Sequence, residues 1–161
     1  MRRWIGILLI AVLLLALPSC GEEKGARATL DGILPELGPL PAGRLYDSEA
    51  AEWEDTYLDR ALVTALFARA DGTSEWEGRV EAGALYLASH AEPYLEVAVL
   101  LCYGSADCRA VIEMCLRRAA LVTARLSLPD EAVTVVSRGR TVVLLLAEDE
   151  EVRDRFSRSY P

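Results

Sequence analysis

The most reactive side chains in this 161-residue chain are its four cysteines, three of which, Cys102, Cys108 and Cys115, lie close together in sequence. Cys102 ends a predicted strand and Cys108 lies in the first turn of the next predicted helix, so their thiols could approach each other. A helix N-terminus lowers the pKa of a thiol, which would make Cys108 redox-active. Cys115 is seven residues further along the helix, roughly 10.5 Å at 1.5 Å per residue, beyond disulfide reach of Cys108. The alternative, favoured by the lack of a CxxC pair, is that all three are small buried apolar side chains.

The remaining polar side chains do not assemble into a catalytic or metal site. His90 is the only histidine and falls in a predicted hairpin turn, without a nucleophile and an orienting group that could be placed beside it. The acidic run 47–59 lacks the alternating ligands and the glycine of a calcium loop, and 71–75 has too few ligands. No GxGxxG, GxxxxGK(S/T), HExxH or GxSxG motif occurs. We therefore expect no enzymatic activity, no metal and no cofactor.

Two tryptophans, Trp53 and Trp76, lie in polar stretches, where they are candidates for contact with a partner. Together with several tyrosines they could line a carbohydrate- or peptide-binding groove. Packing in the core is the alternative, and it is the better interpretation for the tyrosines on predicted strands.

The N-terminus has the pattern of an export signal. Arg2 and Arg3 precede an apolar run of 14 residues, 4–17, which is shorter than the roughly 20 residues of a membrane-spanning helix. The run ends in Leu-Pro-Ser-Cys, which resembles the lipobox of bacterial lipoproteins. The resemblance implies that residues 1–19 are a signal peptide, that Cys20 carries the lipid, and that the protein lies on the extracytoplasmic face of the cell membrane.

The net negative charge of the chain is consistent with attachment to the membrane through a lipid. The chain has 17 basic and 25 acidic residues, a net charge of −8, and loss of Arg2 and Arg3 with the signal would leave −10. An acidic domain is repelled by an anionic membrane surface, so the acyl group must provide the attachment. The same acidic balance argues against nucleic acid as a partner.

Behind the signal, residues 20–45 are rich in Gly and Pro and predict a tether, or, from Thr29 on, an irregular arm packed on the domain. Residues 46–161 predict a single α+β domain. Its sheet has about four antiparallel strands in two hairpins, a long helix across one face and shorter flanking helices. The expected strands are 83–89, 94–103, 133–137 and 140–147, and the expected helices are 57–70, one that Ser105 caps and that ends near Leu126, and 148–157.

Several phrases of the sequence are similar to one bacterial lipoprotein family. They are the lipobox, the segment 46–50 (YDSEA), the strand text LYLAS, and EVAVLLCYGSAD leading into VIEMCLRRA. These phrases resemble lipoproteins of clostridia-type bacteria catalogued as domain of unknown function 4358, over about residues 29–150. The resemblance implies an exported lipoprotein with a small α+β domain, and it implies no activity, cofactor or catalytic residue.

Together these features predict a membrane-anchored, non-catalytic binding or interaction domain whose partner is another envelope protein. One alternative is a thiol redox protein that uses Cys102 and Cys108. A second alternative is a lipoprotein that captures a small ligand, which requires a cleft beside Trp76.

Overall fold

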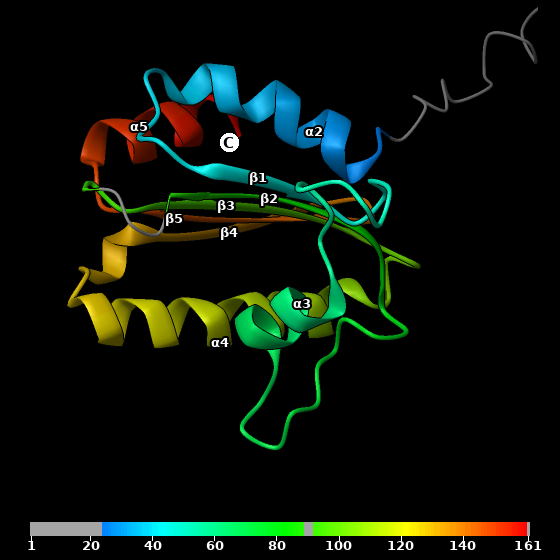
Figure 1. The fold of residues 1–161 in the computed structure, drawn as a ribbon. Coiled ribbons are helices and arrows are strands. Elements are labelled where there is room, and N and C mark those ends of the chain that lie inside the picture. The colour runs from blue at the N-terminus through cyan, green and yellow to red at the C-terminus, as the bar shows by residue number, and fades with distance from the viewer. Residues whose placement is uncertain (1–23, 89–91, 161) are drawn as a thin grey trace, which may run out of the picture.

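The computed structural model describes residues 24–88 and 92–160, which form an antiparallel sheet with helices on both faces (Figure 1). The strands follow the order β1-β2-β3-β5-β4. Their bounds are β1 Arg44–Asp47, β2 Val80–Ala88, β3 Leu95–Cys102, β4 Val133–Arg138 and β5 Thr141–Ala147. The helices are α2 Ala26–Ile33, α3 Arg60–Phe67, α4 Cys108–Leu126 and α5 Glu150–Ser159, with short 3₁₀ helices η1 Leu34–Leu37 and η2 Asp130–Ala132. The predicted α+β class is confirmed, with a five-stranded sheet where about four strands were expected.

Strand β3 lies at the centre of the sheet and is buried along its whole length, because helices cover both of its faces. Alternate side chains point to opposite faces of a strand. Leu95, Val97 and Val99 pack in one core cluster with residues of α2 and α5, whereas Ala98 and Leu100 pack in a second cluster with residues of α3 and α4. Figure 1 shows these two helical layers on either side of the sheet.

The segment expected to be a tether or an irregular arm contains a helix. In α2, Ala26, Leu30 and Ile33 follow the i, i+4, i+7 spacing of one helical face, and all three are buried. Leu37 of η1 is buried in the same cluster. The structured body therefore includes residues well before Tyr46, where the domain was expected to begin. The Gly and Pro residues of this region fall largely in the loop between η1 and β1 and do not prevent the preceding helical turns.

Two further expectations differ from the structure on the side of α3. This helix is shorter than the predicted 57–70, because Asp59 caps its N-terminus by accepting a hydrogen bond from the Leu62 N–H (2.7 Å). Strand β1 was not predicted, and its four residues are too few for a clear alternating pattern. Within the described residues no helix is long and apolar enough to cross a membrane.

Candidate binding cleft beside Trp76

A cleft of ≈ 610 Å³ opens on the α3 side of the sheet. Its walls are the turn after β1, helix α3 and the loop 68–79 that joins α3 to β2, which projects beyond α3 in Figure 1. The lining residues are Ser48, Tyr57, Leu58, Arg60, Val63, Thr64, Gly72, Thr73, Ser74, Trp76 and Glu77. The volume lies within the roughly 300–1,000 Å³ that is usual for small-molecule pockets.

Trp76 is held in this cleft by packing on two sides. Its ring lies 5.6 Å, centroid to centroid, from the ring of Phe67. Its outer edge lies against Gly83 of β2, where an added Cβ atom would collide with the indole. Glycine is therefore required at position 83 for the indole to lie on the strand. The backbone N–H of Trp76 donates to Ser74 Oγ (3.1 Å), which orders the main chain that carries the ring.

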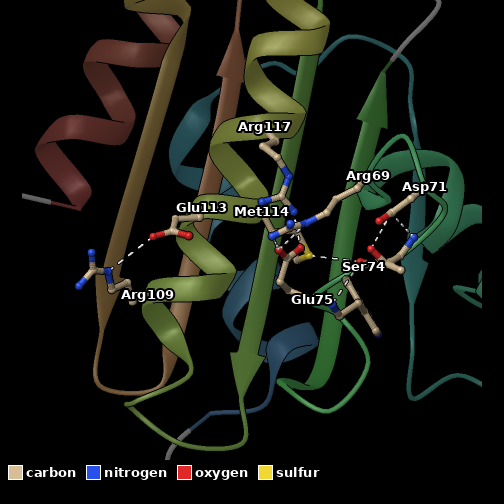
Figure 2. A network of polar contacts seen from close by, with 10 residues as sticks. Arg69, Asp71, Ser74, Glu75, Arg109, Glu113, Met114 and Arg117 are labelled. Atoms are coloured by element: carbon tan, nitrogen blue, oxygen red, sulfur yellow. Dashed lines mark hydrogen bonds and ion pairs between the residues drawn. The ribbon is translucent and has the colours of Figure 1, made fainter.

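The loop that carries Trp76 is fastened to α4 by a partly buried carboxylate. Figure 2 shows Glu75 between the guanidinium groups of Arg69 and Arg117, which both donate to it. We call these three residues the Glu75 clasp. The Glu75 side chain is 13% exposed. Burial by itself would raise the pKa of Glu75, but the hydrogen bonds from Arg69, its own backbone and Arg117 outweigh burial and lower the pKa.

Two further contacts order the same loop. The Thr73 hydroxyl and backbone N–H both donate to Asp71 Oδ1, at 2.6 and 2.9 Å, and these bonds lower the pKa of the Asp71 carboxyl. Ser74 Oγ lies 3.5 Å from the sulfur of Met114 on α4 (Figure 2). The outer wall of the cleft is thus fixed by side chains that are in place before any ligand arrives.

The opposite wall is joined to the sheet through Ser48. The Gly83 N–H donates to Ser48 Oγ (2.8 Å), and the Ser48 N–H donates to the Gly83 carbonyl (2.9 Å). At the exposed rim, Arg60 and Glu77 form an ion pair at 2.7 Å. The opposite charges of this pair cancel each other.

The structure places the two candidate tryptophans differently. Trp76 lines the cleft, whereas Trp53 is 87% exposed and does not. Trp53 lies on the turn segment that leaves the cleft wall at Ser48 and returns to it at Tyr57. Sequence analysis grouped Trp76 with several tyrosines, Tyr57 among them, as a possible groove lining. It did not place Ser48 or Thr64 beside Trp76, because these residues reach the cleft only through the fold.

The candidate redox residues Cys102 and Cys108 do lie together, and both are buried with free thiols. Burial, followed by the hydrogen bond and charge of the neighbouring Cys108, raises the pKa of Cys102 to about 12. Cys108 Sγ donates weakly to the carbonyls of Gly104 (3.8 Å) and Gly139 (3.6 Å). Burial also raises the pKa of Cys115 to about 12. Protonated, buried thiols are poor nucleophiles, so this environment fits the apolar interpretation better than the redox one.

One polar cluster was not predicted from the sequence, because its carboxylate sits in an apolar strand. Glu96 on β3 is fully buried and faces α4, where Arg118 donates to both carboxylate oxygens (3.2 and 2.8 Å). The Tyr94 hydroxyl also donates to Glu96 (2.7 Å). Burial and the Glu96 charge raise the pKa of Tyr94. None of the three residues lines the cleft, and a lone Glu in a run of valines and leucines was the available signal.

Two residues singled out in the sequence lie outside the described part of the chain. Cys20 and His90 both fall outside residues 24–88 and 92–160. Across those two ranges, no group of three or more His, Cys, Asp and Glu side chains could hold a metal ion.

Comparisons with protein-family models, curated proteins and solved structures find no match to this chain.

Proposed function

We propose that this chain is a lipid-anchored, extracytoplasmic binding domain and that the cleft beside Trp76 is its binding site. The observation that carries the proposal is the cleft itself, a concave space of ≈ 610 Å³ with Trp76 in its lining. Its outer wall is held by the Glu75 clasp, so little order has to be gained on binding. Preorganised sites bind more tightly for this reason.

A binding role is favoured over catalysis by the chemistry of the lining. Among the described residues that line the cleft, Glu77 is the one carboxylate, and it is paired with Arg60. Asp71 accepts from the lining hydroxyl of Thr73, but its lowered pKa makes this carboxylate a poor general base for activating that hydroxyl as a nucleophile.

The proposal is tested by filling the cleft with a large side chain. Thr64 and Ala65 are neighbours on α3 and both are exposed, but Thr64 lines the cleft and Ala65 does not. We expect a small-molecule fraction of the culture or cell envelope to raise the thermal midpoint of the native chain and of Ala65→Trp. The Thr64→Trp variant should show no such rise. An equal rise in the thermal midpoint of both variants would show that the ligand binds outside the cleft. No rise in the native chain would contradict the proposed binding function.

The anchor is a separate part of the proposal and rests on the lipobox-like sequence at Cys20. Cys20→Ser should release the domain from the membrane or leave an unprocessed precursor. A fatty-acid label on the native chain and not on Cys20→Ser is the expected readout, and equal labelling of both would refute lipidation at this residue.

A second candidate function is contact with another envelope protein through Trp53. The observation that favours it is the 87% exposure of this large aromatic side chain. Trp53→Ala should then remove a cross-linked envelope partner without changing the thermal shift given by small molecules. If the cross-linked partners are the same for both chains, Trp53 is not a contact residue.

A thiol redox function of Cys102 and Cys108 is supported by their proximity but opposed by their burial. Thiol trapping in cells separates the two possibilities. A redox function requires reversible labelling of both residues, whereas buried structural thiols give label only after denaturation.

A further inference from the structure

We propose that the ligand of the Trp76 cleft is a neutral saccharide. This inference rests on the proposed binding function and names the chemical class of its ligand. It is drawn from the charge, the hydroxyl groups, the aromatic rings and the backbone of the cleft, each considered in turn.

The cleft offers no unbalanced charge to a charged ligand. Among the described lining residues, Arg60 and Glu77 are the oppositely charged pair, and they hold each other at 2.7 Å. The Glu75 clasp behind the outer wall holds two guanidinium groups and one carboxylate, and the charge of the nearby Asp71 carboxylate, which also acts on Arg69, offsets the remaining positive charge. Because these charges sum to zero, an anionic or cationic ligand would lose hydration without meeting an excess of counter-charge, so a neutral ligand is favoured.

Five of the lining residues carry hydroxyl groups, namely Ser48, Tyr57, Thr64, Thr73 and Ser74. Within the described part of the chain, the hydroxyls of Tyr57 and Thr64 have no hydrogen-bond partner. Ser48 Oγ accepts a bond from Gly83 and retains its own proton for donation. A hydroxyl both donates and accepts, so this lining matches a ligand that is itself rich in hydroxyl groups.

Aromatic surface supplies the apolar part of the site. Trp76 is held by Phe67 and Gly83, and Tyr57 lies in the facing wall of the same cleft. A sugar ring presents C–H groups on its faces and hydroxyl groups at its edge. Fixed aromatic rings beside hydroxyl groups are therefore complementary to both parts of a sugar.

A peptide ligand finds fewer free backbone hydrogen-bonding groups where β1 meets the cleft. Peptides commonly bind by adding a strand to an open sheet edge. Where β1 reaches the cleft, Asp47 already donates its N–H to the Thr56 carbonyl (2.7 Å), and its carbonyl accepts from the Leu58 N–H (3.0 Å). The chain's own segment 56–58 thus occupies the edge that a peptide would use.

The experiment measures binding of defined neutral sugars to the full chain by isothermal titration calorimetry. The chain is kept in a zwitterionic detergent, because detergents with sugar headgroups would compete. The probes are cellobiose, N,N′-diacetylchitobiose and maltotriose, with tetra-alanine as the peptide probe and inorganic phosphate as the anion probe. We expect saturable binding of at least one sugar and none of phosphate.

Hydroxyl-deletion variants then locate the sugar in the cleft. Tyr57→Phe and Thr64→Val should each weaken binding about 2- to 10-fold, the effect of one neutral hydrogen bond. Tyr103→Phe and Thr134→Val remove the same groups outside the cleft and should bind like the native chain.

The outcomes separate the ligand class from the proposed function. If no sugar binds, or if a sugar binds equally to Thr64→Trp and the native chain, the saccharide proposal is wrong. The proposed function still stands in that case if tetra-alanine or the small-molecule fraction gives a thermal shift that Thr64→Trp abolishes. Loss of that shift as well would overturn both.

Discussion

Glu75 decides, at the scale of a single residue, whether the outer wall of the cleft is fixed. Its carboxylate accepts hydrogen bonds from Arg69, in the same loop, and from Arg117, on α4 (Figure 2). Neither arginine could be held as well by the neutral acid, because charge-assisted hydrogen bonds are about twice as strong as neutral ones. The ionisation state of one side chain is therefore coupled to the position of the loop.

The lowered pKa of Glu75 predicts a pH-dependent stability with a definite sign. A carboxyl whose pKa is lower in the folded than in the unfolded protein stabilises the fold above its unfolded pKa, and this contribution is lost as pH falls through the folded pKa. We expect Glu75→Gln to lower the free energy of unfolding by about 1–2 kcal/mol near neutral pH. The difference from the native chain should shrink below the ordinary glutamate pKa of 4.5.

Urea unfolding between pH ~3 and ~7 checks this prediction, with Glu113→Gln as the control. Glu113 pairs with Arg109 at 3.5 Å on the exposed face of α4, so its neutralisation should change stability by about 0–1 kcal/mol. A difference between Glu75→Gln and the native chain that stays constant with pH would contradict the ionic role of the clasp.

At the scale of elements, β3 and α4 are joined by the only fully buried carboxylate among the described residues, that of Glu96. Arg118 compensates its charge with two hydrogen bonds, and Tyr94 supplies a third. A buried charge left without its partner is far more costly than a pair that was never present. The cluster therefore fixes how α4 lies across the sheet.

Replacing only Arg118 in the Glu96–Arg118 pair should lower the free energy of unfolding more than replacing both residues. We expect Arg118→Met to lower the free energy of unfolding by about 3–5 kcal/mol, because Glu96 remains charged in an apolar layer. In the double variant Glu96→Gln/Arg118→Met the buried charge is gone, and the amide oxygen that replaces the carboxylate can still accept from Tyr94. The double variant should unfold at higher urea concentration than Arg118→Met alone, and additive losses would contradict the buried pairing.

The elements that could be predicted from the sequence are those with strong periodic patterns. The long helix ends at Leu126 as predicted, and the two hairpins β2–β3 and β4–β5 are confirmed. The prediction that Ser105 caps this helix is wrong, because the residue at the N-cap is Asp107. Strand β1 and helix α2 were missed because one is too short and the other is followed by Pro and Gly residues. Trp76 was identified as a candidate, but its cleft depends on pairings such as Ser48 with Gly83, 35 residues apart, which no local pattern contains.

At the scale of the whole molecule, α2 and η1 cover one face of the sheet together with α5, and α2 begins close to the expected anchor. Ala26 lies only six residues beyond Cys20. The two can be at most roughly 20 Å apart, at ~3.3–3.6 Å per residue. The proposed lipid would therefore hold the domain close to the membrane, on a shorter link than the 20–45 tether expected from sequence.

The same geometry predicts that the domain cannot fold from Tyr46 onwards. Leu30, Ile33 and Leu37 are at most 2% exposed and pack in one core cluster with Val97 and Val99 of β3. Burial of each such side chain contributes about 1.5–3 kcal/mol, so loss of the three approaches the roughly 5–15 kcal/mol of a typical domain. A chain that begins at Lys24 should unfold cooperatively in urea, whereas one that begins at Tyr46 should bind a hydrophobic dye and lack a cooperative transition. Equal urea midpoints for the two chains would show that the core folds without α2 and η1, and the domain boundary would then lie at Tyr46.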